Sequence, residues 1–180
     1  MIFLGAIAVV ALWFILSYNG LISARNMVKN AWSQIDVQLK RRYDLIPNLV
    51  ELVKDYMSYE QETLTKVVQA RQHAIEVSGV KEQAQAEAQL TASLRQLFAL
   101  VENYPQLKAN ENVGRLQEEL TTTENKISFA RQHYNDSVMR YNTKLQTIPT
   151  NFIATMFNFA AEAYWETPSE ERGPVKVDLR

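Results

Sequence analysis

Residues 30–50 read NAWSQIDVQLKRRYDLIPNLV and lie between an apolar segment and a series of long stretches with helical spacing. Asp44 is a suitable N-cap residue, and Pro47 suits the first turn of a helix, where its missing N–H costs nothing. The residue before a proline also disfavours helix. The stretch therefore predicts a corner at which one helix ends, near Tyr43, and the next begins. A kink at Pro47 within one continuous helix is the alternative.

The apolar segment before this stretch runs from Ile2 to Ile22 and contains no charged residue. A bilayer core of about 30 Å needs about 20 helical residues, so the segment is long enough to span a membrane. Trp13 and Tyr18 lie toward its C-terminal end, where amphipathic rings favour the membrane interface. No Lys or Arg precedes it and no small-x-small cleavage site follows, which favours an anchor over a signal peptide. A buried core helix is the least expected alternative.

The charges beside this segment predict its orientation. Arg25 and Lys29 follow it, and Lys40, Arg41 and Arg42 lie further along. The positive-inside rule then places the body of the protein in the cytoplasm and the N-terminus outside, with a single membrane span between them.

Composition narrows the protein class. Hydrophobic residues make up 47% and charged residues 22%, which is typical of a folded chain. Five Gly and five Pro among 180 residues favour few, long elements over a strand-rich fold. A net charge of −1 gives no case for a nucleic-acid partner. The absence of Cys excludes disulfides, thiolate metal sites, a Cys nucleophile and a lipid-modified Cys.

The apolar spacing beyond residue 21 predicts helices throughout. Trp32, Ile35 and Leu39 follow this spacing and are expected to be core residues. The first helix continues out of the membrane, and the others are expected at about 45–77, 81–103, 113–148 and 151–165. The fold class is therefore all-α: an N-terminal transmembrane helix continuing into an antiparallel up-and-down four-helix bundle with a short C-terminal amphipathic helix. The expected boundaries are 1–22 for the anchor, 23–148 for the bundle, 149–166 for the short aromatic helix and 167–180 for an extended or flexible tail.

The expected helix lengths do not match. The fourth bundle helix, with about 40 residues, would span ~60 Å, against ~37 Å for the first helix beyond the membrane. Its near-strict alternation of apolar positions at threes and fours predicts a coiled-coil-like seam. It must overhang, bend or pack on something else. An up-and-down order also returns its end, and the aromatic helix, to the neighbourhood of the anchor.

Several ordered segments of the chain resemble the LemA family of bacterial membrane proteins. They are Tyr18-Asn19, Arg25-Asn26, Ala31-Trp32, Ile35 to Arg42, Asp44 to Val50, Tyr104 to Asn110, Leu116 to Leu120, Glu124-Asn125, Ala130-Arg131 and Tyr134-Asn135. The resemblance covers nearly the whole chain and implies an N-terminal membrane anchor and an antiparallel helical bundle, but no reaction. Some members look like lipoproteins with a Cys before the Tyr-Asn pair, where this chain has Ser17. Such members would lie outside the cytoplasm, in conflict with the orientation predicted from charge.

Lys40, Arg41 and Arg42 are candidate partner or lipid contacts. They lie roughly 30 Å beyond the anchor along a straight helix, which argues against lipid headgroups. The favoured interpretation is that they neutralise acidic residues at the corner, namely Asp36, Asp44 and Glu51.

Other polar positions predict packing or solvation, and no catalytic, cofactor-binding or metal-binding residue is expected. His73 and His133 end identical Ala-Arg-Gln-His tetrapeptides, but a metal site needs three or four ligands and the chain has no third His and no Cys. Glu118 and Glu119 lie off the apolar seam. Tyr134-Asn135 and Tyr141-Asn142 are one heptad apart and predict a packing ladder. The seam also carries Thr123, Glu124, Asn125 and Asn142.

The aromatic helix, rich in Phe, Tyr and Trp, could contact either the membrane interface or protein. Entry into the membrane interface would suit its rings. It lacks a Lys/Arg face, however, and it carries Glu162 and Glu166. Docking on the bundle end, or a subunit contact, is therefore expected.

No phosphate-binding loop and no Ser/His/Asp order is present. The predicted function is a non-catalytic scaffold or adaptor at the bacterial envelope, with the lipid bilayer as partner, assembly into a homo-oligomer, and another membrane protein as a further candidate partner. The alternative is an accessory or regulatory subunit of a membrane enzyme such as an envelope protease. The resemblance favours this alternative, since family members are often encoded near a membrane metalloprotease.

Overall fold

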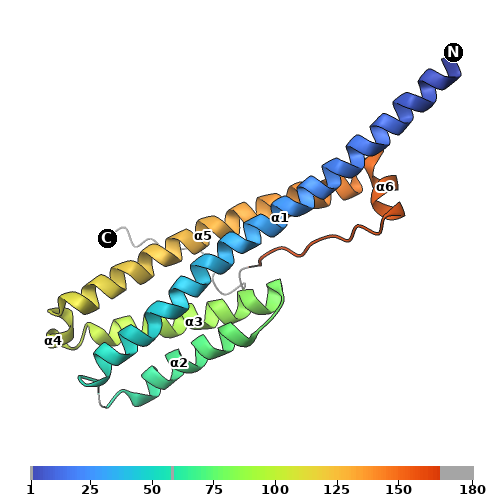
Figure 1. Cartoon of the computed structure of the whole chain (residues 1–180). Coiled ribbons are helices and arrows are strands. Elements are labelled where there is room, and N and C mark those ends of the chain that lie inside the picture. Colours follow the sequence, from blue (N-terminus) through green and yellow to red (C-terminus); the bar gives the residue numbers. More distant parts are fainter. Residues whose placement is uncertain (1, 58, 167–180) are drawn as a thin grey trace, which may run out of the picture. The chain divides into compact units, whose positions relative to one another are not determined.

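The computed structural model describes residues 2–57 and 59–166, and within these ranges the chain forms six helices and no strand (Figure 1). This confirms the all-α prediction. The predicted tail, 167–180, lies outside the described residues. The helices are α1 (Ile2–Lys54), α2 (Gln61–Glu76), α3 (Val80–Val101), α4 (Pro105–Lys108), α5 (Glu111–Gln146) and α6 (Thr150–Met156).

The chain divides into two compact units, and α1 and α5 contribute to both. We call Met1–Val37 with Ser128–Tyr164 the helix-pair unit. We call Gln38–Ile127 the four-helix unit.

Four antiparallel helices build the four-helix unit, with α4 as a short connector between α3 and α5. Each helix contributes buried apolar side chains at helical spacing, which is why the chain folds into a bundle here. The largest cluster contains Ile46, Leu49 and Val53 of α1, Leu64 and Val67 of α2, Leu90, Leu94 and Leu97 of α3, and Val113 and Leu120 of α5. Leu39 is also buried in this unit, as predicted.

Helix α1 continues through Pro47 to Lys54, so the predicted corner at Asp44–Pro47 is wrong and the continuous-helix alternative is correct. A proline inside a helix leaves the carbonyl four residues earlier without its N–H donor. Here that carbonyl belongs to Tyr43, and Arg71 Nε of α2 donates to it at 2.7 Å. Pro47 itself is exposed, so its ring meets solvent rather than a neighbouring helix. Arg71 thus supplies the hydrogen bond that Pro47 removes.

Replacing Arg71 with methionine is expected to lower the free energy of unfolding by about 1–3 kcal/mol, because the Tyr43 carbonyl loses its donor. Pro47→Ala restores an N–H at the normal helical position, so the same Arg71→Met change should cost less in a Pro47→Ala background. Urea unfolding of the full-length chain in a non-ionic detergent measures both effects. Lys66→Met, on the exposed side of α2, is the control. Equal costs in the two backgrounds would contradict the assignment.

The chain reverses about ten residues later than predicted. The amides of Tyr56 and Met57 both donate to the Val53 carbonyl, at 3.1 and 3.0 Å, and Met57 is buried. Helix α2 therefore begins at Gln61 rather than near Leu45. The next reversal is where the sequence placed it: Gly79 has a φ of 100°, in the region that favours glycine, and α3 starts at Val80.

The helix-pair unit contains the first part of α1 and the last part of α5, which run antiparallel. Lys144 Nζ donates to the Gly20 carbonyl at 3.2 Å, and the rings of Trp32 and Tyr134 are 5.5 Å apart in an edge contact. Ile35 is fully buried, as predicted. Trp32, also predicted to be core, is only partly buried. In this unit the last part of α5 pairs with α1, which accounts for the length of α5.

Helix α6 is shorter than predicted: it ends at Met156, and residues 157–166 are not helical. The seam also ends earlier than expected, because α5 stops at Gln146 and Ile148 is exposed. Buried Ile153 and Ala154 of α6 pack with Leu21 of α1. The predicted return of this segment to the anchor is confirmed.

Candidate interaction sites

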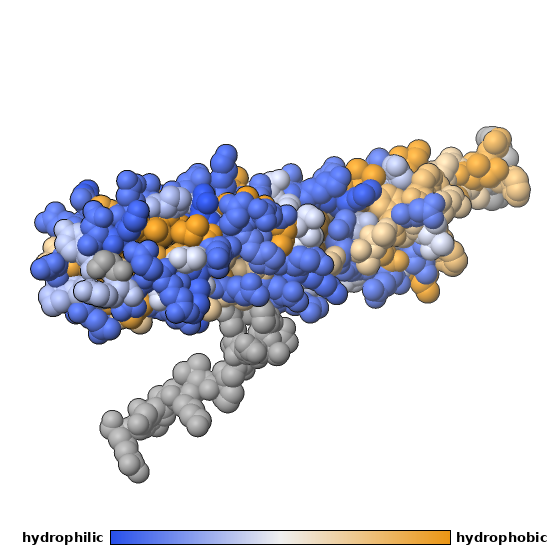
Figure 2. Space-filling view, turned by 90° about the horizontal axis from the view of Figure 1, so that it is seen from below, coloured by the Kyte–Doolittle hydropathy of each residue, from blue (hydrophilic) through white to orange (hydrophobic). Residues whose placement is uncertain are grey.

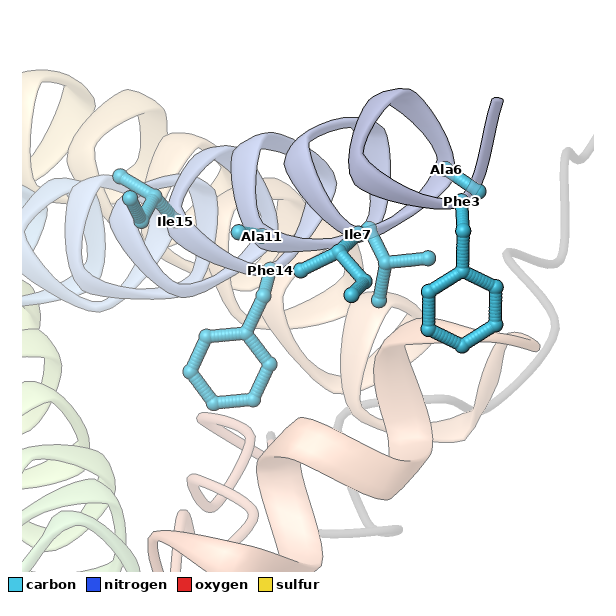
Figure 3. Close-up of a pocket in the computed structure, with 7 residues that line it drawn as sticks. Phe3, Ala6, Ile7, Ala11, Phe14 and Ile15 are labelled. Carbon is cyan, nitrogen blue, oxygen red and sulfur yellow. The ribbon is translucent and has the colours of Figure 1, made fainter. Parts of the chain in front are cut away.

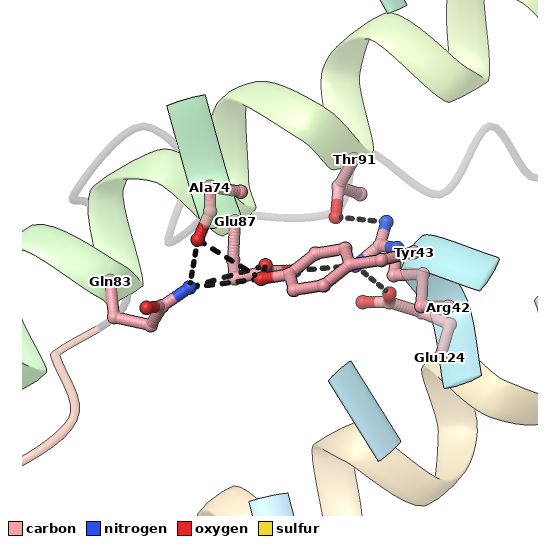
Figure 4. A network of polar contacts seen from close by, with 7 residues as sticks. All are labelled: Arg42, Tyr43, Ala74, Gln83, Glu87, Thr91 and Glu124. Carbon is pink, nitrogen blue, oxygen red and sulfur yellow. Dashed lines mark hydrogen bonds and ion pairs between the residues drawn. The ribbon is translucent and has the colours of Figure 1, made fainter. Parts of the chain in front are cut away.

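The four-helix unit contains a buried polar network centred on Arg42 of α1 (Figure 4). The guanidinium group lies 3.1 Å from Glu87 of α3 and 2.7 Å from Glu124 of α5, and it donates to the Thr91 hydroxyl at 2.8 Å. Arg42 is 3% exposed and Glu87 is 0% exposed. One cation thus joins two carboxylates and a hydroxyl from two other helices.

Tyr43 and Gln83 complete the network around Glu87. The Tyr43 hydroxyl donates to Glu87, and Gln83 Nε2 donates to the Tyr43 oxygen and to the Ala74 carbonyl, each at 3.0 Å. Burial, and then the negative charge of Glu87, raise the pKa of Tyr43 well above its usual value. The phenol therefore stays protonated and remains a donor.

A small open cavity of about 190 Å³ adjoins this network, lined by Arg42, Thr91, Arg95, Phe98 and Glu124 among others. Thr121, at its edge, donates its hydroxyl to the Gln117 carbonyl. Of the groups that line the cavity, Arg42 binds both Thr91 and Glu124. The arrangement is better suited to holding α1 against α3 and α5 than to forming a reaction centre.

The three predicted cations occupy different environments. Lys40 and Arg41 are exposed, whereas Arg42 points into the bundle. Arg41 pairs with Glu119 at 3.5 Å, with both side chains half exposed, so the pair contributes little stability. The expected partners Asp36, Asp44 and Glu51 are thus replaced by carboxylates of α3 and α5. Lipid or partner contact by Lys40 and Arg41 stays a prediction.

Side chains of α5 hold the segment that follows α6. The hydroxyls of Tyr134 and Tyr141 donate to the carbonyls of Ala163 and Ala160, at 2.9 and 3.0 Å. Asn142 makes two bonds to the backbone of Glu162, donating at 2.9 Å and accepting at 3.0 Å. The heptad-spaced Tyr and Asn side chains therefore bind a peptide backbone within the same unit, where the sequence predicted a packing ladder.

Burial raises the pKa of both tyrosines, Tyr134 to about 12. Their hydroxyls therefore remain protonated at physiological pH and can donate to the Ala163 and Ala160 carbonyls.

The histidines and the remaining acidic pair lie at the surface. His73 is exposed in the four-helix unit and His133 in the helix-pair unit. His133 borders a shallow polar cavity with Asn30, Ser137 and Arg140. Glu118 and Glu119 are exposed, as expected. Among the described residues, no group of three or more His, Cys, Asp or Glu is placed to hold a metal ion.

The sequence interpretation missed the partners of Arg42. Gln83, Glu87 and Thr91 belong to α3, and all three are buried. They are four residues apart, so they share one face of α3. Leu90 and Leu94 follow on the same side, and this spacing was the available signal that polar side chains enter the core.

Comparison with known proteins gives one family match and several relatives. The model of the LemA family matches residues 31–179. Protein LemA of Metamycoplasma hominis is 27% identical over 161 residues, which cover 89% of this chain and 73% of that protein. Magnetosome protein MamQ 2 of Paramagnetospirillum magneticum is 22% identical, covering 86% of this chain and 67% of its own length. Magnetosome protein MamQ of Magnetospirillum gryphiswaldense is 20% identical, covering 84% and 65%.

Proposed function

This chain belongs to the LemA family, and we propose that it acts as a non-catalytic scaffold or adaptor that a single helix holds at a bacterial membrane. The observation that carries the proposal is that the early and late parts of α1 have different surroundings. Its early residues, among them Phe3, Leu4 and Val9, are apolar and exposed. Its later residues, from Leu21 onward, supply buried positions in both units.

The exposed apolar part of α1 has the properties of a membrane span. The helix is long and apolar enough to cross a bilayer. Hydrophobic residues cover its N-terminal end, whereas hydrophilic residues dominate the visible surface elsewhere (Figure 2). An exposed apolar surface of this kind is unfavourable in water and favourable in lipid. Because α1 is unbroken to Lys54, the helix that enters the membrane also builds the bundle core.

A non-catalytic role agrees with the polar groups in the core. Arg42, Glu87 and Thr91 bond one another and cross-link helices. Their contacts serve packing, and the phenol of Tyr43 is held in its neutral form. Active sites more often carry groups whose pKa is tuned toward neutrality.

An adaptor needs a surface for partners, and the helix-pair unit offers one outside the span. Met27 and Val37 of α1 and Phe129 and Met139 of α5 are large apolar residues that remain exposed. Such residues favour contact with a second copy or with another membrane protein. By the positive-inside rule, the cations Arg25 and Lys29 just beyond the span support a cytoplasmic location for this surface.

Site-specific photo-cross-linking in native membranes tests the proposal. A photoreactive residue at Phe129 of the full-length chain is expected to capture a second copy or one stoichiometric membrane protein. The same residue at exposed Glu118 is the control and should capture far less. A captured membrane enzyme would favour the accessory-subunit alternative. A chain that stays uncaptured from position 129 and purifies as a monomer without partners would contradict the adaptor role.

A further inference from the structure

We propose that residues 145–161, which include α6, insert into the boundary between lipid headgroups and acyl chains beside the span of α1. We call these residues the interfacial segment. The proposal rests on the membrane anchoring proposed above and adds a second lipid contact to it.

The composition of the interfacial segment suits this boundary. From Leu145 to Ala161 the chain contains no charged residue, although charged residues are frequent on both sides of it. Its polar side chains are amides and hydroxyls, such as those of Asn151, Thr155 and Asn158. Uncharged polar groups mixed with aromatic and aliphatic ones are compatible with the partly hydrated edge of a bilayer.

Ring contacts fix the depth of the segment relative to α1. The ring of Phe157 lies 5.9 Å from that of Phe14 and 4.8 Å from that of Tyr18, and Phe159 lies 5.9 Å from Tyr18. Tyr18 belongs to the last third of the apolar stretch Ile2–Ile22, and Phe14 lies two residues before that third. Since about 20 helical residues are needed to cross the bilayer core, α1 uses this part for the membrane edge. The interfacial segment therefore lies at the depth of that edge.

The outer side of the interfacial segment is apolar and unburied. Phe152 and Met156 of α6, and Ile148 just before it, are exposed large apolar residues. The buried contacts between α6 and α1 use Ile153 and Ala154. One face of α6 thus binds α1, and the other is available to acyl chains.

The surface of α1 beside α6 is also open. Figure 3 shows Phe3, Ile7 and Phe14 projecting from one side of α1, the side on which α6 lies. Together with Ala6, Ala11 and Ile15 they line an apolar groove formed by α1 residues alone. The exposed faces of α6 and α1 are therefore adjacent, and lipid can cover them as one surface.

Cations mark the headgroup side of this surface. Lys144 immediately precedes the uncharged segment and donates to the Gly20 carbonyl at 3.2 Å. Arg25 and Lys29 follow Gly20 on α1, and Arg140 precedes Lys144 by four residues on α5. Positive side chains at this level complement lipid phosphates. In this arrangement Lys144 lies at the level of the lipid headgroups, and α6 lies closer to the acyl chains.

The chain has no Cys, so a single introduced cysteine can carry a nitroxide label at one chosen position. The label is placed at Phe152, with Met156 as a second site, in the full-length chain reconstituted into vesicles of phosphatidylcholine and phosphatidylglycerol. Its collisions with lipid-soluble oxygen and with a water-soluble nickel complex are then compared. Tyr59, which is 95% exposed and lies outside the apolar surface of the helix-pair unit, is the control in water, and Val9 reports the span itself.

Labels at positions 9, 152 and 156 are expected to favour oxygen, whereas the label at 59 favours the nickel complex. If 152 and 156 behave like 59 while 9 favours oxygen, the interfacial segment lies in water and this inference fails, but the anchor stands. If 152 and 156 are shielded from both reagents, a protein contact covers them and the inference also fails. If position 9 favours the nickel complex, the anchor itself is refuted.

Discussion

Replacing Arg42 with methionine is expected to lower the free energy of unfolding of the four-helix unit by about 3–5 kcal/mol. The change removes the cation while Glu87 stays fully buried and Glu124 stays beside it. Loss of the cation leaves the Glu87 carboxylate buried among neutral donors, among them Tyr43 and Gln83, which do not offset the cost of desolvating its charge. The expected loss therefore reflects the stranded charges more than the packing of the arginine.

The neighbouring residue supplies the control for this prediction. Arg41→Met removes a cation whose pair with Glu119 is half exposed, so a loss of at most about 1 kcal/mol is expected. Glu87→Gln added to Arg42→Met should recover part of the stability, because it removes the stranded charge. Urea unfolding of the full-length chain in a non-ionic detergent, followed by circular dichroism, gives all three values. Similar losses of unfolding free energy for Arg41→Met and Arg42→Met would contradict the claim that burial of the charges determines the cost.

The second large effect is expected in the span. Val9→Arg together with Leu12→Arg places two arginines near the middle of the apolar stretch, at a cost of about 5–7 kcal/mol for insertion into the bilayer. The double variant should therefore move from the membrane fraction to the soluble or aggregated fraction of the cell. Fractionation with quantitative immunodetection measures this shift.

The same helix offers a matched control beyond the span. Val37 is 63% exposed, close to the 68% of Val9, and Met27 is also exposed. Met27→Arg together with Val37→Arg adds the same charges to α1 outside the apolar stretch, and this variant should stay with the membrane. If both double variants distribute alike, the early part of α1 does not anchor the chain.

Periodicity predicted most of the fold because it reflects burial directly. The seam of α5 was placed correctly from Val113 to Tyr141, and both are buried. The reversal at Pro47 was predicted wrongly because local propensity favours a boundary there. A tertiary contact, Arg71 to the carbonyl of Tyr43, overrides it by replacing the missing donor. No single-residue preference reports a donor supplied by another helix.

The candidate sites were harder to predict than the helices. Arg42 is adjacent to exposed Lys40 and Arg41, so the run looked like one solvated cluster. Helical geometry points adjacent residues in different directions, and only the positions of Glu87 and Glu124 decide which cation is buried. The aromatic segment at 151–165 was expected to dock on protein because it lacks a Lys/Arg face. Exposure of Phe152 and Met156 beside the apolar part of α1 now favours lipid.

The central claim is that α1 anchors the chain in the membrane and builds the bundle with one unbroken helix. Alkaline carbonate extraction of membranes that contain the unaltered full-length chain tests it most directly. The chain is expected to remain in the membrane pellet, while a peripheral protein in the same sample is released. Release of the chain into the supernatant together with the peripheral protein would contradict the claim.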